Sequence, residues 1–216
     1  MAGPNLVVIT GAVEGDVDEA VMRRLVEHVG ATPGPVYGRN GKNHLRQRLD
    51  GYNQAARFSP WVVLVDLNHD ADCAPPFCAS WLPNPAPYMC FRVAVRMVEA
   101  WLLADRERLA RFLSVAVAQI PLSPEGVDDP KHTMVELAKL SRRREIREDM
   151  VPRPGSGRIV GPAYTSRLIE FVLGGTSGWR PEVAAKLSDS LDRCLDCLRQ
   201  LVKGAQDLRS GRGQDG

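Results

Sequence analysis

Two short apolar runs, each followed by acidic residues, constrain the fold of this chain most strongly. Leu6–Thr10 (LVVIT) and Trp61–Val65 (WVVLV) are uncharged and rich in β-branched residues. Runs of this kind are typical of strands that are buried on both faces, as in a parallel sheet. The two runs therefore predict neighbouring strands in the core of an α/β fold.

The segments around these runs show helical spacing of apolar residues. Asp16–Val29 has this spacing, and it recurs over Leu45–Ala56. Ala74–Pro87 is rich in proline and is predicted to be a loop. Phe91–Val95 is predicted to be a third strand, which passes into a helix over Met97–Phe112. Strands that alternate with helices favour a mainly parallel α/β sheet flanked by helices.

The character of the chain changes near residue 121. Residues 1–120 are predicted to form the α/β core. Residues 121–209 combine prolines, glycines and clustered arginines with a final amphipathic helix that starts at Pro181. We therefore expect a basic loop region and a mostly helical C-terminal part that pack on the core. Residues 210–216 are polar and are predicted to be a disordered tail.

Bulk properties set limits on compartment without identifying a function. The net charge is +2 and 44% of the residues are hydrophobic, which is ordinary for a packed globular protein. No basic start followed by a long apolar run is visible, so neither a secretory signal nor a membrane span is expected. Five cysteines, an odd number, favour free thiols in a reducing compartment. The chain is therefore expected to be cytoplasmic.

Acidic residues follow each predicted strand. They are Glu14 and Asp18 after the first strand, Asp66 and Asp70 after the second, and Glu99 beyond the third. Ligands of parallel α/β folds bind beyond the carboxyl ends of the strands. Carboxylates that meet there repel one another unless a cation compensates, and hard oxygen ligands suit Mg²⁺ or Mn²⁺. The pattern predicts that these carboxylates converge on a divalent metal ion.

Each acidic residue also has a structural interpretation. Acidic residues after strands often cap helices or form Asx turns, and this applies to Asp18 and Asp70. Asp66 ends an apolar run, so its carboxylate is expected to be partly sheltered. Glu99 lies among apolar neighbours, where an unpaired charge is costly. Asp66, Glu14 and Glu99 are therefore the strongest candidates.

The first of these motifs resembles that of a known family. The segment VVITGAVEGDVDEAVMRRLVE is similar to the opening of a TOPRIM domain, and more closely to that of the OLD-type (overcoming lysogenisation defect) nucleases. Glu14, Gly15 and Asp18 match the family's glutamate, glycine and aspartate. The resemblance implies a TOPRIM-like fold in which Glu14 and Asp18 contribute to metal binding and catalysis.

The second motif of the family, Asp-X-Asp, is only partly present. Asp66 matches its first position, but Asn68 stands at the second. An asparagine still offers a carbonyl oxygen to a metal, and Asp70 or Asp72 is an alternative ligand. The stretch EAWLLAD, from Glu99 to Asp105, resembles a motif of a group of bacterial TOPRIM-like proteins that are discussed with phage-defence nucleases.

The resemblance implies a Mg²⁺-dependent nucleic-acid phosphodiesterase, with a possible role in phage defence. Glu14 would be a ligand or general base, Asp66 the principal metal ligand, and Glu99 part of the surrounding shell. Lys131, Arg92 and Arg96 are candidate cations for stabilising the charged transition state, although each could equally be a solvated or ion-paired surface residue. Clustered basic residues, from Arg39 to Arg48 and from Arg142 to Arg147, could contact phosphates, although such runs are usually solvated surfaces.

A non-catalytic role is the alternative. OLD-like TOPRIM domains often work with an ATPase, and this sequence has no P-loop motif. The chain could therefore be a partner or sensor subunit of a separate ATPase, and it could form a homo-oligomer. The departure at Asn68 from the family's second aspartate makes a weakened site plausible under this alternative.

Overall fold

The computed structural model describes residues 6–212, with side chains described through Asp207. Within this range the chain forms two compact units. The first unit contains the chain up to Val93 and again from Asp192 onward, and the second contains Ala94–Leu191. This division falls before the stretch Glu99–Asp105, which the sequence analysis assigned to the α/β core.

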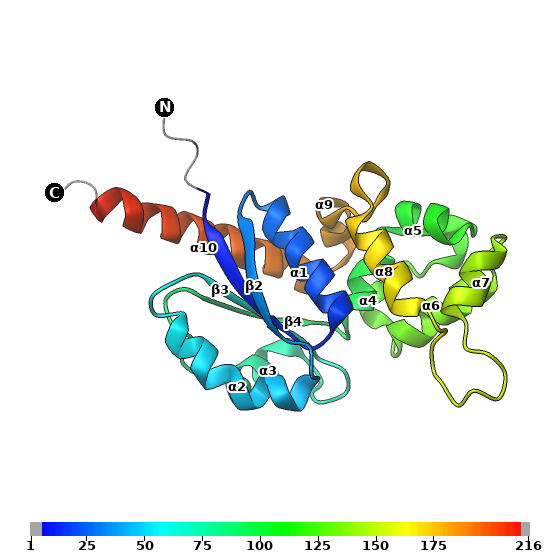
Figure 1. Ribbon diagram of the computed structural model, residues 1–216, viewed down its shortest axis with the longest axis horizontal. Helices are drawn as coiled ribbons and strands as arrows, with labels where there is room; N and C mark the ends of the chain where they lie inside the picture. Colours follow the sequence, from blue (N-terminus) through cyan, green and yellow to red (C-terminus); the bar gives the residue numbers. More distant parts are fainter. Residues whose placement is uncertain (1–5, 213–216) are drawn as a thin grey trace. The chain divides into compact units, whose positions relative to one another are not determined.

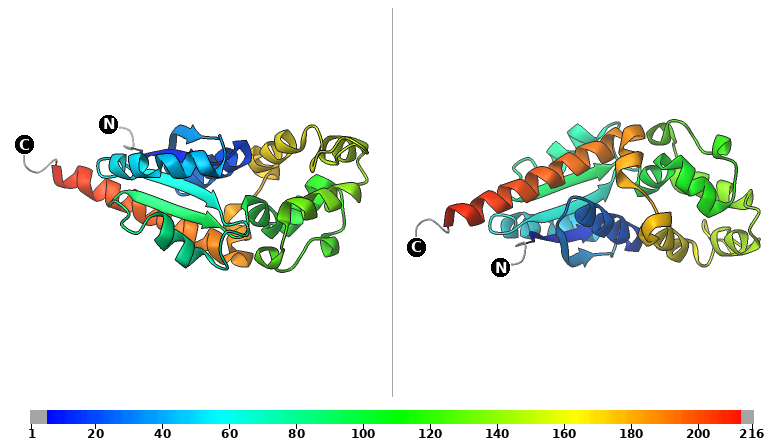
Figure 2. Two further views of the ribbon diagram at one scale, coloured as in Figure 1. Left: turned by 90° about the horizontal axis from the view of Figure 1, so that it is seen from below. Right: turned by 90° about the horizontal axis from the view of Figure 1, so that it is seen from above.

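The first unit is built on a four-stranded parallel sheet with the order β2-β1-β3-β4. The strands are β1 (Val8–Val13), β2 (Thr32–Gly38), β3 (Trp61–Asp66) and β4 (Met89–Ala94). The helices that cover it are α1 (Asp16–His28), α2 (Lys42–Ala55), α3 (Ala74–Trp81) and α10 (Asp189–Arg212). α1 and α10 lie on one face of the sheet and α2 and α3 on the other (Figures 1 and 2). The predicted α/β class and parallel sheet are confirmed.

The two central strands form the core of this unit. The five apolar residues of β3 are all buried, as expected for a strand covered on both faces. β1 extends beyond the predicted end at Thr10 as far as Val13, through Gly11. A Cβ at Gly11 would lie 2.5 Å from the Cε atom of Met22, so the glycine lets α1 pack directly on the strand. Because of this extension, β1 ends immediately before Glu14.

The second unit is mainly helical. Its α-helices are α4 (Val98–Ala104), α5 (Arg106–Leu113), α6 (Pro130–Lys139), α7 (Arg144–Met150), α8 (Tyr164–Leu173) and α9 (Pro181–Ala184). Short 3₁₀ turns are present at Val117–Gln119, Pro124–Gly126, Gly175–Ser177 and Ala185–Leu187. The basic segment predicted as loops thus contains α6 and α7, and the mostly helical character predicted for the C-terminal part is confirmed.

Two predicted helices are interrupted. The helix expected over Met97–Phe112 is divided at Asp105, whose side chain accepts a hydrogen bond from the backbone of Arg108 and caps α5. The final helix was predicted to start at Pro181. In the structure, the short helix α9 starts there and ends at Ala184, and the long final helix, α10, begins at Asp189.

α10 continues to Arg212, so it includes the first residues of the segment predicted to be a disordered tail. Residues 213–216 of that segment lie outside the described part. Over the residues that the structure describes, no helix combines the length and the apolar character needed to span a membrane.

Candidate functional site

Glu14 and Asp66 lie together at the carboxyl edge of the sheet. Asp66 is the last residue of β3, and Glu14 directly follows β1, its parallel neighbour. The backbone amide of Asp66 donates a hydrogen bond of 2.8 Å to Oε1 of Glu14. The structure thus brings together two of the predicted site residues.

Asp18 lies in the same corner of the first unit. It belongs to the first turn of α1, and only 7% of its surface is exposed. A Cβ at Gly15, the N-cap of α1, would lie 3.1 Å from Oδ2 of Asp18. The carboxylate of Asp18 therefore packs against the backbone that follows Glu14, and the positive end of the helix dipole stabilises its charge.

The loop after β3 was predicted to supply metal ligands. In the structure its residues Asn68 and Asp70 have other features. Asn68 has a positive φ of 52°, which an asparagine tolerates better than most residues. Oδ2 of Asp70 lies 2.7 Å from Nζ of Lys42, so an ion pair already compensates the charge of Asp70. The pairing with Lys42 therefore reduces the negative charge that Asp70 can offer to a metal ion.

The oxygen donors fit a metal site with few protein ligands. Among the described residues, no three His, Cys, Asp or Glu side chains form a group that could hold a metal ion. Mg²⁺, however, is usually bound by one or two carboxylates, several waters and substrate phosphate. The pair of Glu14 and Asp66 suits that kind of site, provided that Glu14 exchanges its hydrogen bond with Asp66 for a metal.

The second unit contains a separate polar cluster around Glu99, which is only 2% exposed. The hydroxyl of Tyr164 donates a hydrogen bond of 3.3 Å to Oε1 of Glu99. Nζ of Lys131, a half-exposed residue, lies 3.6 Å from the same oxygen. The sequence singled out Glu99 and Lys131 independently, and the structure brings them together. The sequence did not point to Tyr164, because no local pattern marks a tyrosine that pairs with a residue 65 positions away.

Burial keeps Tyr164 protonated. Desolvation raises the pKa of its hydroxyl far above the ordinary value of 10.0, and the neighbouring carboxylate of Glu99 raises the pKa further. The hydroxyl is therefore a fixed hydrogen-bond donor to Glu99. The predicted convergence of Glu99 with Glu14 and Asp66 involves both units, and it stays a prediction.

The other acidic residue of the EAWLLAD stretch has a structural role. Asp105 is fully buried, and its Oδ1 lies 2.7 Å from a guanidinium nitrogen of Arg180. Its Oδ2 accepts hydrogen bonds from both the backbone amide and Nε of Arg180. These contacts join α5 to the segment before α9 within the second unit.

The arginines near residue 144 are mostly engaged locally. Arg143 pairs with Glu145 at 2.8 Å, and Arg144 pairs with Glu148 at 2.6 Å. These exposed pairs agree with the interpretation of the arginine run as a solvated surface, since the adjacent acidic residues neutralise its positive charge. This cluster is a weak candidate for phosphate contacts.

Comparisons of the chain with models of protein families, with curated proteins and with solved structures found no match.

Proposed function

We propose that this protein is a nucleic-acid phosphodiesterase that depends on Mg²⁺ or Mn²⁺ and uses the carboxylates at the carboxyl edge of its sheet. The observation that carries the proposal is the meeting of Glu14 and Asp66 at the ends of adjacent central strands, 2.8 Å apart from carboxylate to amide. Ligand sites of parallel α/β sheets lie at this edge. The resemblance of the Glu14, Gly15, Asp18 motif to TOPRIM nucleases agrees with this location.

The roles of the residues follow from their environments. Asp66, at the end of β3, is the principal metal ligand in this proposal, and Glu14 is a second ligand or the base that accepts a proton from the attacking water. Asp18 is buried beside them and adds negative charge that favours a cation. A bound divalent ion would neutralise charge on the phosphate and lower the pKa of a coordinated water.

The same proposal includes the cellular setting. All five cysteines are free thiols in the structure, which suits a reducing compartment such as the cytoplasm. Nucleic acid is the proposed partner, because a metal held by few carboxylates leaves coordination positions for phosphate oxygens. A role in phage defence is part of what the family resemblance suggests.

A cleavage assay tests the proposal. Labelled single-stranded and duplex DNA and RNA are incubated with the protein and Mg²⁺, Mn²⁺ or EDTA. We expect cleavage that requires the metal and falls at least about 100-fold in Glu14→Ala and in Asp66→Ala, since each change removes a ligand charge. Asp16→Ala is the matched control, because Asp16 lies exposed in the same turn as Asp18. Cleavage that survives both site substitutions rejects the assignment.

One observation favours a second candidate, a non-catalytic partner or sensor subunit of a separate ATPase. The loop after β3 offers Asn68 where the TOPRIM pattern has an aspartate, and Asp70 is held by Lys42. Less negative charge is then available for a second metal ion. Co-purification with an ATPase from a bacterial lysate, together with no cleavage by the purified pair, would favour this candidate.

A further inference from the structure

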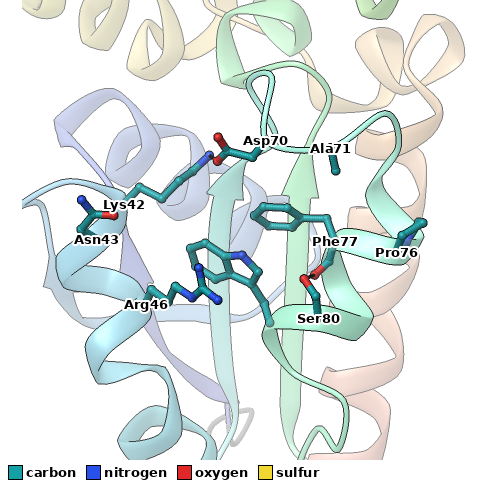
Figure 3. A pocket seen from close by; sticks show the side chains of 9 residues that line it. Lys42, Asn43, Arg46, Asp70, Ala71, Pro76, Phe77 and Ser80 are labelled. Atoms are coloured by element: carbon teal, nitrogen blue, oxygen red, sulfur yellow. Dashed lines mark hydrogen bonds and ion pairs between the residues drawn. The ribbon is translucent and has the colours of Figure 1, made fainter.

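A pocket of about 590 Å³ lies in the first unit between α2 and α3 (Figure 3). Its volume is in the range of sites that hold one small molecule or one unit of a polymer. The lining residues come from these two helices and from the loop after β3. They are Lys42, Asn43, Arg46, Asp70, Ala71, Pro76, Phe77, Ser80 and Trp81.

One wall of the pocket is cationic. Lys42 and Arg46 are one helical turn apart on α2, so they present their charges on the same side. Figure 3 shows both side chains extending from α2 toward the cavity. Lys42 is paired with Asp70, whereas none of the described carboxylates forms an ion pair with Arg46. The pocket therefore has a net positive charge that suits an anion.

The opposite wall is aromatic. Phe77 and Trp81 are one turn apart on α3, and their rings stack with centroids 4.8 Å apart. The guanidinium of Arg46 lies 5.3 Å from the centroid of the Trp81 ring, and Nζ of Lys42 lies 5.5 Å from that of Phe77. Planar groups that stack on tryptophan include nucleobases. The Trp81 ring also stacks on Phe91, with centroids 6.2 Å apart, so a base would bind by displacing the Arg46 guanidinium from the ring.

The pocket adjoins the candidate site of the first unit. The backbone amide of Gly41, just before Lys42, donates a hydrogen bond of 3.1 Å to the backbone oxygen of Glu14. Nζ of Lys42 also lies 3.5 Å from the backbone oxygen of Leu67, the residue after Asp66. A polymer whose phosphate reached Glu14 and Asp66 would thus have its next unit close to the pocket.

We propose that this pocket binds one nucleotide of a single-stranded nucleic acid. The base takes the place of the Arg46 guanidinium over Trp81, and Arg46 and Lys42 hold the phosphate. A base in a duplex is already stacked and paired, so it cannot lie on a protein ring without being extruded. The pocket thereby selects single strands over duplexes. This inference deepens the proposed function and rests on it for the polymeric nature of the ligand.

Binding in the absence of chemistry tests the inference. Fluorescence anisotropy is measured with a labelled oligothymidylate of about 15 nucleotides and with a duplex of the same length, both in EDTA. We expect Arg46→Ala to weaken single-strand binding by about 5-fold or more, because it removes a charged contact to the phosphate. Arg57→Ala is the matched control, because it removes the same charge from an exposed position just after the same helix that does not line the pocket.

A second pair of variants distinguishes the loss of the Trp81 ring from a loss of folding. Trp81→Phe keeps a stacking surface and should retain most single-strand binding, whereas Trp81→Leu should lose it while circular dichroism confirms that both variants are folded. Equal effects of Arg46→Ala and Arg57→Ala on single-strand binding would overturn the inference. So would binding of adenosine monophosphate as tightly as the oligonucleotide, since that would indicate a mononucleotide site.

The outcomes also separate this inference from the proposed function. Metal-dependent cleavage with no change of single-strand binding in Arg46→Ala would contradict only the pocket assignment. Single-strand binding that depends on Arg46, with no cleavage under any metal condition, would support the pocket and reject the phosphodiesterase.

Discussion

The amide of Asp66 donates a 2.8 Å hydrogen bond to the carboxylate of Glu14, a residue 52 positions earlier in the chain. The bond connects the loop after β1 to the last residue of β3. It holds one carboxylate oxygen of Glu14 at the carboxyl edge of the sheet without help from any ligand. The charge of this side chain and its hydrogen bond can therefore be tested separately.

Glu14→Gln should separate these two contributions. The amide oxygen of glutamine can still accept the hydrogen bond from Asp66, so the free energy of unfolding should change by less than about 1 kcal/mol. The negative charge is lost, so the affinity for Mn²⁺ should fall at least about tenfold, an effect seen even for residues that only support a metal ligand. Isothermal titration calorimetry measures the affinity, with Asp16→Asn as the exposed control. Unchanged Mn²⁺ affinity in Glu14→Gln would remove Glu14 from the metal site.

The ion pair between Asp105 and Arg180 should stabilise the second unit. Arg180→Met leaves the fully buried carboxylate of Asp105 without its cation, and we expect a loss of about 3 kcal/mol in the free energy of unfolding. Arg199→Met is the matched control, because it breaks an exposed pair with Asp196 at 2.8 Å and should cost less than about 1 kcal/mol. Urea unfolding followed by circular dichroism measures both. Similar losses in the two variants would contradict a special role for the buried pair.

Tyr164 should make stability fall at alkaline pH. The raised pKa means that folded Tyr164 keeps its proton, whereas the unfolded chain releases it above the ordinary value of 10.0. The stabilisation is thus complete below pH 10 and is lost as the pH rises further, by about 1.4 kcal/mol per pH unit. Tyr164→Phe should lose only this share of the slope, because the buried thiols of Cys90 and Cys194 also have raised pKa values and contribute their own. At neutral pH the variant should be about 1–2 kcal/mol less stable because Glu99 loses a donor.

Unfolding curves at pH values on both sides of 10 check this expectation. Tyr37→Phe, which removes the hydroxyl of a tyrosine that is 48% exposed, is the control and should keep the alkaline slope of the wild type. If the free energy of unfolding fell equally steeply with pH in Tyr164→Phe and in the wild type, a group other than Tyr164 would be the cause.

The cysteines should react in an order set by exposure and pKa. Cys73 is exposed and should be alkylated first. Cys197 should follow, because a hydrogen bond with Cys90 lowers the pKa of the Cys197 thiol and the residue is only partly buried. Burial raises the pKa of Cys90, and that of Cys194 to about 12, so these two thiols should react only on unfolding. Timed iodoacetamide labelling with mass spectrometry measures the order, and early labelling of Cys194 would contradict the packing around α10.

Local patterns were enough to predict the central strands of the sheet but not all the helices. The runs LVVIT and WVVLV predicted the two central strands because burial on both faces requires uninterrupted apolar side chains. The helix α3 was missed, since its prolines suggested a loop. Pro75 and Pro76 lie in the first turn of α3, where backbone amides have no partner within the helix and proline is tolerated. The prolines therefore mark the start of a helix, and the prediction of a loop from Ala74 was wrong.

The sequence by itself determined which acidic residues follow each strand, because the order of residues along the chain is a local property, although β1 ends at Val13 and not at the predicted Thr10. Glu14 and Asp66 were identified in this way. Only the tertiary structure decided their hydrogen bond, the pairing of Lys42 with Asp70, and the contact of Tyr164 and Lys131 with Glu99. These partners are brought together by the packing of distant segments, and no periodicity along the chain encodes which side chains meet.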